Sequence, residues 1–71
     1  MNRQASKIFA NGERKEILLP CSLVKFLESQ NLRPQNVVVE HNGQALAHSQ
    51  FAQVQLADGD RLEIVQIVAG G

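Results

Sequence analysis

The chain has 71 residues, of which 44% are hydrophobic and 20% are charged. This composition is typical of a folded globular domain and excludes a disordered chain. The length allows one domain and leaves little room for a large enclosed active site. Seven Lys and Arg balance seven Asp and Glu, so the net charge gives no indication of nucleic-acid binding.

The charged side chains are unevenly distributed along the chain. Residues 1–33 hold six of the seven basic groups and three acidic ones. The acidic half, residues 34–71, is therefore expected to face a basic surface of a partner. The charged side chains of residues 34–71 are Arg61, Glu40, Asp58, Asp60 and Glu63.

The sequence has no apolar run of about 18 residues and no apolar leader with a cleavage site, which predicts a cytosolic protein that does not enter a membrane.

Cys21 is the only cysteine, and this excludes an internal disulfide framework. We expect it to be a half-buried packing residue, because a nucleophilic thiol needs a lowered pKa. His41 and His48 lack nearby cysteines and an i, i+4 spacing, so we expect two ordinary surface histidines and no metal site.

The first half of the chain predicts a hairpin. Residues 1–5 are polar and without pattern, and we expect a disordered extension there. A strand is expected over residues 6–10, followed by Asn11-Gly12, which suits the positive φ angles of a tight turn. The antiparallel partner strand is expected over residues 16–19, ending at Pro20.

A helix is expected next. The Ser22 hydroxyl can cap its first turn, and the helix should run to about Gln30, with Pro34 preventing its resumption. Its apolar stripe, spaced i, i+3 and i+4, would pack on the strands. This stripe consists of Leu23, Phe26 and Leu27.

The second half predicts further strands. The β-branched run at residues 37–39 predicts a strand that continues to His41 and a second tight turn at Asn42-Gly43. A short edge strand is expected over residues 44–46. Residues 48–56 are expected to form a turn of helix and irregular backbone. Their core anchors would be Phe51, Val54 and Leu56.

The last strand is expected over residues 62–68, after a sharp turn at residues 58–60. Because strand side chains alternate, Leu62 and Ile64 should point at the helix, while the other face should carry Glu63, Val65 and Ile67. Exposed Val65 and Ile67 would form an apolar patch for a partner. The alternative is that a neighbouring loop buries them.

This order of elements predicts an α+β roll, with a mixed sheet of four to five strands and the helix on one face. A right-handed crossover through the helix favours placing the first and last strands side by side at the centre. We expect the folded domain to span residues 6–68, followed by a flexible tail at residues 69–71.

We expect the tail, Ala69-Gly70-Gly71, to end in a free carboxylate. Residues without a side chain can enter a channel that a Cβ would block. The sequence holds no motif for a nucleotide, a metal or a catalytic nucleophile, so we expect a protein that is not an enzyme itself. A carboxylate is a poor electrophile at neutral pH, and its use as a carrier group requires activation, such as adenylation by ATP.

The element order, the Asp-Gly-Asp turn at residues 58–60 and the terminal Gly-Gly resemble the ubiquitin-like β-grasp sulfur carriers, over about residues 7–71. The chain is most similar to the ThiS family of thiamine biosynthesis. The small subunit of molybdopterin synthase, the MoaD family, shares these features and remains an alternative. That family usually carries paired prolines where this chain has Gln66 and Ile67, and its members are usually longer.

The resemblance implies that a ThiF-like, E1-type adenylyltransferase activates Gly71 with ATP and that no cofactor is bound by the chain itself. A cysteine desulfurase or another sulfur donor would then supply sulfur, giving a thiocarboxylate that is delivered to a ThiG-like thiazole synthase. Gly70 and Ala69 would pass through the partner's channel. The expected partner-binding residues are Val65, Ile67, Glu63, Asp58 and Asp60.

Two other functions fit the same sequence. A ubiquitin-like modifier would use Gly71 to join lysines of target proteins, after the same activation. A pure interaction domain would carry the two glycines incidentally.

Overall fold

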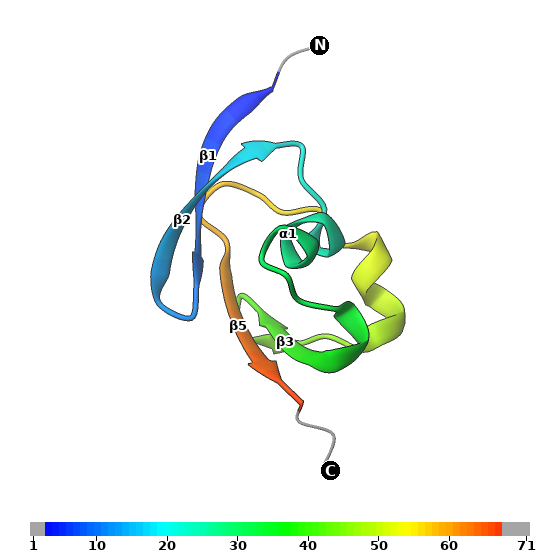
Figure 1. Cartoon of the computed structure of the whole chain (residues 1–71). Helices are drawn as coiled ribbons and strands as arrows, with labels where there is room; N and C mark the ends of the chain where they lie inside the picture. Colours follow the sequence, from blue (N-terminus) through cyan, green and yellow to red (C-terminus); the bar gives the residue numbers. More distant parts are fainter. Residues whose placement is uncertain (1–2, 68–71) are drawn as a thin grey trace.

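The computed structural model describes residues 3–67. They form a five-stranded mixed sheet in the order β2-β1-β5-β3-β4, with one α-helix packed on one face (Figure 1). The predicted α+β roll is therefore confirmed. Two short 3₁₀ helices complete the fold. The elements are β1 (Gln4–Ala10), β2 (Glu13–Leu19), α1 (Leu23–Ser29), η1 (Pro34–Asn36), β3 (Val37–His41), β4 (Gln44–Ala45), η2 (His48–Gln53) and β5 (Arg61–Gln66).

The predicted hairpin is confirmed, and its strands are longer than expected. Asn11 and Gly12 have φ angles of 51° and 80°, the backbone of a two-residue turn between antiparallel strands. Pairing starts at Gln4, and Ala5 lies opposite Leu18. The prediction of a disordered extension over residues 1–5 is therefore wrong for Gln4 and Ala5, because a hairpin register set by its turn extends through polar residues as well. Residues 1–2 lie outside the described part.

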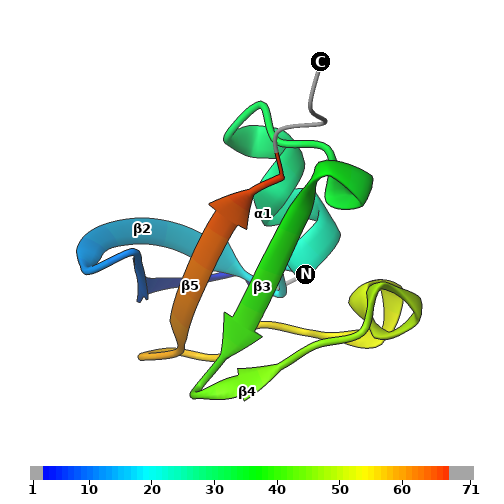
Figure 2. The same ribbon diagram turned by 90° about the horizontal axis from the view of Figure 1, so that it is seen from below.

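The first and last strands lie side by side at the centre of the sheet, as predicted. β1 runs parallel to β5 with Ala10 opposite Leu62, and β3 runs antiparallel to β5 along its whole length. Figure 2 shows β5, β3 and β4 as neighbours, with the helix behind them. The short edge strand β4 pairs only with β3. β5 therefore has a strand on each side.

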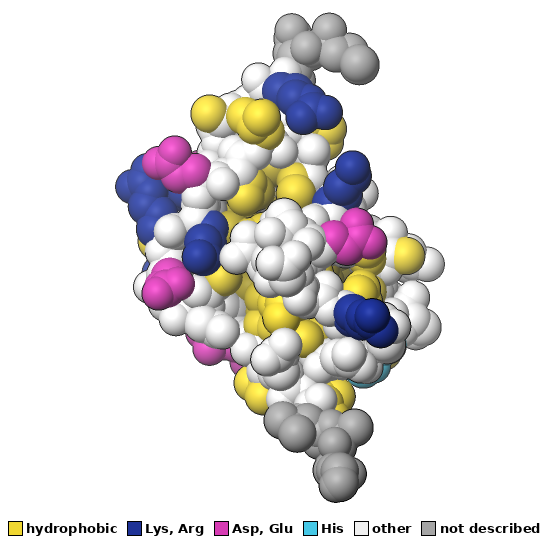
Figure 3. Space-filling view, in the orientation of Figure 1, with side chains coloured by type: hydrophobic (Ala, Val, Ile, Leu, Met, Phe, Trp, Pro, Cys, Tyr) yellow, Lys and Arg dark blue, Asp and Glu magenta, His cyan; other side chains and the backbone are white. Residues whose placement is uncertain are grey.

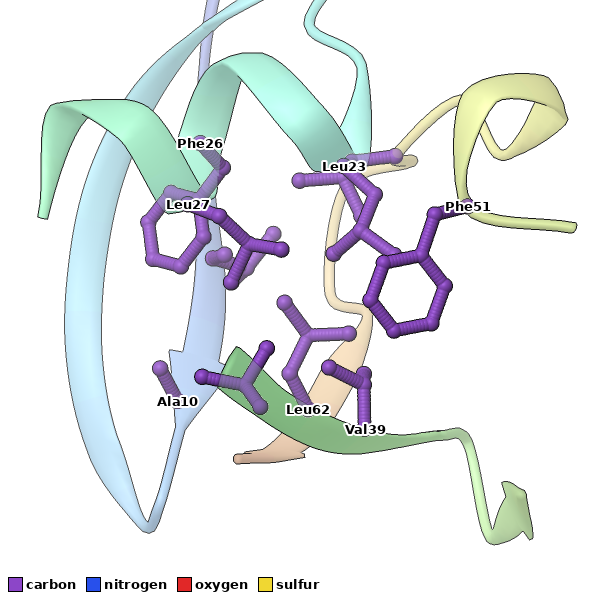
Figure 4. Packing of buried hydrophobic residues seen from close by; sticks show 10 residues of the cluster. Ala10, Leu23, Phe26, Leu27, Val39, Phe51 and Leu62 are labelled. Carbon is purple, nitrogen blue, oxygen red and sulfur yellow. The ribbon is translucent and has the colours of Figure 1, made fainter. Parts of the chain in front are cut away.

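The helix forms where the sequence predicts it. The Ser22 Oγ accepts a hydrogen bond from the Lys25 N–H at 3.0 Å, which caps the first turn. Asn31, with a φ of 61°, ends the last turn. The three stripe residues are buried, and they meet the sheet side chains Ala10, Val39 and Leu62 (Figure 4). A helix of only seven residues depends on this packing for its stability.

The connection between β4 and β5 contributes to the core, as predicted. Phe51 and Leu56 are buried, and Val54 packs partly against them. Two backbone bonds tie this segment to the start of α1: the Leu23 N–H donates to the Val54 carbonyl and the Leu56 N–H to the Cys21 carbonyl. Among residues 3–67, no helix is long and apolar enough to cross a membrane.

Candidate functional site: the outer face of β5 and its anchors

The strand β5, which leads to the C-terminus, is fixed by a side chain of the first Asn-Gly turn. The Asn11 Oδ1 accepts from the Ile64 N–H at 2.7 Å, and its Nδ2 donates to the Ile64 carbonyl at 3.1 Å. Parallel pairing between β1 and β5 ends at Ala10 and Leu62. The Asn11 amide therefore continues the ladder and satisfies backbone groups that would otherwise lack a partner on that side.

The second Asn-Gly turn also holds the start of β5, through one side-chain and one backbone contact. The Asn42 Oδ1 accepts from the Arg61 N–H at 2.8 Å, and the Asn42 N–H donates to the Arg61 carbonyl at 2.8 Å. A third contact joins the Ile67 N–H to the Asn36 carbonyl at 2.7 Å. β5 and the residue after it are thus anchored at three positions, three residues apart, up to the last described residue.

The sequence pattern identified Asn11 and Asn42 as turn residues and missed their contacts with β5. The signal for Asn11 is the side-chain amide, which both donates and accepts and so pairs with the N–H and the C=O of Ile64, as neither Gly nor Asp could do. At Asn42 the side-chain oxygen accepts from the Arg61 N–H, and the backbone N–H donates to the Arg61 carbonyl.

Asp60 lies inside the domain, which corrects its expected place among the partner-binding residues. It is only 8% exposed. Its Oδ2 lies 2.8 Å from the His41 Nε2 and accepts from the Ala57 N–H at 2.9 Å, and its Oδ1 accepts from the Asn42 Nδ2 at 3.1 Å. Burial alone would raise the pKa of Asp60, but these hydrogen bonds outweigh it and hold the pKa below its ordinary value. Its carboxylate is used to close the turn before β5.

Asp58, in contrast, lies at the surface. Its Oδ1 accepts from the Lys7 N–H at 3.1 Å and lies 3.5 Å from the Lys7 Nζ. The backbone hydrogen bond is the main cause that lowers the pKa of Asp58. Of the two carboxylates in the Asp-Gly-Asp turn, only this one is accessible to a partner.

The two histidines have structural contacts. His41 is not the ordinary surface residue that we expected, because its side chain is 23% exposed and lies against Asp60. His48 is exposed, and its Nε2 lies 2.8 Å from the Val37 carbonyl. Within residues 3–67, no three His, Cys, Asp or Glu side chains gather in a way that could hold a metal ion.

Cys21 is half-buried, as predicted. Burial raises the pKa of its thiol more than the nearby Lys25 lowers it. The reactive thiolate is therefore scarcer than for a free cysteine, which argues against a nucleophilic role.

The side chains of β5 alternate as predicted. Leu62 is fully buried and Ile64 packs partly against the core, whereas Val65 is 60% exposed and Ile67 48% exposed. The alternative, in which a loop covers Val65 and Ile67, is contradicted within the described residues. Val38 of β3 lies directly opposite Val65 and is also exposed. Val38 was not predicted as a site residue, although alternation within the β-branched run at residues 37–39 already places it on the outer face.

Val38 and Val65 line an open groove on the outer face of the sheet, with a volume of about 460 Å³. The groove also contains Glu63, an expected partner-binding residue, and Glu40, which was not predicted. The helix-covered side looks different: Lys and Arg alternate there with Asp and Glu around a hydrophobic seam between hairpin and helix (Figure 3). The groove, together with the anchored end of β5, is the candidate functional site. Val68 and the tail residues Ala69, Gly70 and Gly71 lie outside the described residues, so their expected roles stay predictions.

Comparison with known proteins supports a single family. The model of the ThiS family matches residues 6–71. A thiazole synthase of Paramagnetospirillum magneticum is 34% identical over 65 residues, which cover 92% of this chain but only 20% of that protein. This chain therefore spans about a fifth of the length of that relative. The crystal structure of the thiamine biosynthesis protein ThiS from Geobacter metallireducens superposes with a TM-score of 0.77 at 24% identity, covering 92% of this chain and 99% of that one. The fold is thus the ubiquitin-like β-grasp.

Proposed function

The chain belongs to the ThiS family, and on this premise we propose that it is a sulfur carrier protein of thiamine biosynthesis that holds sulfur on Gly71. The observation that carries the proposal is the extent of the family match, which runs through the terminal Gly-Gly to the last residue. The carrier is a co-substrate of other enzymes. The carrier supplies the tail and the surface that positions the tail, and the partner enzymes supply the catalytic groups.

The chemistry begins with activation of the carboxylate. In a ThiF-like adenylyltransferase, a Gly71 oxygen would attack the α-phosphorus of ATP, releasing pyrophosphate and leaving an acyl-adenylate. A persulfide sulfur from a cysteine desulfurase or similar donor would then attack the acyl carbon, and AMP would leave. A thiol would cleave the resulting acyl disulfide, which yields the thiocarboxylate and a disulfide. Dependence on ATP favours a cytoplasmic protein.

The relative from Paramagnetospirillum magneticum supports thiazole synthase as the acceptor. It is named a thiazole synthase, and a segment of about one fifth of its length is similar to this chain. A carrier-like segment in the same chain as a thiazole synthase is expected if the carrier and the synthase contact each other during sulfur transfer. We propose a ThiG-like thiazole synthase as the partner that takes sulfur from Gly71.

The proposed docking surface is the outer face of β5. Val65 and Ile67 are exposed near the end of β5, and Val38 extends the apolar surface onto β3. Burial of such a patch in a complex would hold the partner next to the tail. The accessible carboxylate Glu63 lines the same groove, and Asp58, which lies against Lys7 of β1, would make a separate contact with a partner.

Intact mass spectrometry tests this function. The purified chain is incubated with the adenylyltransferase of its host, ATP and a sulfur donor, and a reaction without ATP is the control. We expect the mass to change by replacement of one oxygen by sulfur, only when ATP is present. An unchanged mass contradicts sulfur carriage, and covalent adducts with other proteins indicate a ubiquitin-like modifier instead.

A further inference from the structure

Two carboxylates face each other on the outer side of the sheet. Glu40 of β3 and Glu63 of β5 are directly opposite in the antiparallel register, both side chains are exposed, and both line the groove described above. Like charges in this position destabilise a sheet. The fold therefore bears a cost at this site that a neutral pair would avoid.

Neither carboxylate forms an ion pair with a cationic side chain of residues 3–67. The four ion pairs of this part of the chain involve other acidic residues: Asp58, Glu16, Glu13 and Asp60. The nearest basic residue along β5 is Arg61, and its guanidinium lies over the Phe9 ring, 5.1 Å from the centroid. The carboxylates of Glu40 and Glu63 are therefore available to a cation of a partner.

The pair is adjacent to the apolar part of the same face. Val38 and Val65 are also directly opposite each other, two residues closer to the C-terminal end of β5 than the acidic pair. Both are exposed. The outer face therefore has two layers: an apolar pair beside the end of the strand, and an acidic pair behind it. A partner that recognises both must carry an apolar group and a cation at matching positions.

We propose that this two-layer face docks a surface of the adenylyltransferase that packs an apolar side chain on Val38 and Val65 and places a Lys or Arg between Glu40 and Glu63. The inference rests on the proposed function, and it adds the charge that selects the partner. A guanidinium can bind two carboxylates at once. A cation placed there would remove the repulsion between Glu40 and Glu63. Relief of this repulsion would therefore add to the free energy of binding.

The test is a double variant, Glu40→Gln with Glu63→Gln, in the full chain. Loss of the repulsion should raise its melting temperature, while its affinity for the host adenylyltransferase at low salt should fall about tenfold or more and depend less on salt. The matched control is Glu13→Gln with Glu16→Gln on the hairpin. It changes the net charge equally and should leave the affinity within about twofold of the parent's.

A double variant that binds as tightly as the parent overturns the proposal, and so does one that loses stability and affinity together. Failure of the proposed function has a different signature. In that case the parent chain itself neither binds the adenylyltransferase nor becomes adenylated, whatever the residues at positions 40 and 63.

Discussion

The two faces of β5 carry similar aliphatic side chains in opposite surroundings. Leu62 is completely buried, whereas Val65, three residues later, is 60% exposed. Composition does not distinguish the two positions; the alternation of the strand and the location of the helix do. The inner face therefore holds the domain together, and the outer face stays exposed within the described residues. Substitutions on the two faces should affect different measurements.

The largest loss of stability is expected on the inner face. Leu62→Ala removes a side chain packed beneath the helix and leaves a cavity, which should cost about 2 to 5 kcal/mol of unfolding free energy. This is a large share of the total for a small domain. Chemical denaturation measures it, and a variant as stable as the parent would show that the core is not organised around β5.

Asp60→Asn should have the next largest effect, because an amide NH₂ would replace a carboxylate oxygen that only accepts hydrogen bonds. The amide keeps only one acceptor oxygen, so either His41 and Ala57 or else Asn42 would lose a partner in a buried place, at a cost of about 1 to 3 kcal/mol at neutral pH. Asp58→Asn is the matched control and should cost less, since Asp58 is exposed. Equal losses would mean that burial of Asp60 contributes nothing.

The same pair of variants also gives a pH test. The pKa of Asp60 is lowered in the folded state, so the unfolded chain takes up the proton first, near the ordinary value of about 3.9. The stabilisation is complete above that value and is lost as pH falls through the folded pKa. Denaturation between pH 7 and pH 3, at roughly one-unit steps, should show a smaller fall for Asp60→Asn than for the parent. An identical fall would contradict the assignment.

Asn11→Gly is expected to have a smaller effect. Gly adopts the φ of 51° without strain, so the turn should persist while both side-chain bonds to Ile64 are lost. We expect about 1 kcal/mol of destabilisation and faster hydrogen exchange of the Ile64 amide. Asn42→Gly, the matched control, should instead expose the Arg61 amide. Unchanged exchange at Ile64 would show that Asn11 does not anchor β5.

The smallest change in stability is expected on the outer face. Val65→Asp adds a charge at an exposed position, where substitutions usually stay within about 0.5 kcal/mol. Its affinity for the adenylyltransferase should nevertheless fall strongly, since a carboxylate would have to be buried against an apolar contact. Denaturation and titration calorimetry on the same preparation separate the two. If Val65→Asp unfolds the domain as Leu62→Ala does, the assignment of the faces is wrong.

Most of the fold follows from local patterns in the sequence. The hairpin turns, the Ser22 cap, the helix stripe and the alternation of β5 each depend on a few neighbouring residues, and each was predicted. The inclusion of Gln4 and Ala5 in β1 was not predicted. Their hydrogen-bonded pairing with β2 follows from the register of the hairpin and not from their side chains.

The candidate site was predicted only in part, for a related reason. Val65 and Ile67 are apparent from alternation in one strand, but Glu40 becomes a partner of Glu63 only when β3 and β5 are placed in register. The contacts of Asn11 with Ile64 and of Asp60 with His41 join residues 53 and 19 positions apart. No local pattern encodes such contacts, so a surface position for Asp60 was the natural and incorrect expectation.

Deletion of Gly71 tests the central claim most directly, because it removes the proposed reacting group and leaves every described residue in place. The truncated chain and the parent are compared for unfolding midpoint and for ATP–pyrophosphate exchange with the host adenylyltransferase. We predict an unchanged midpoint and no exchange above the level of the enzyme alone. Exchange at the parent's rate would contradict the account, since activation could then not occur on the Gly71 carboxylate.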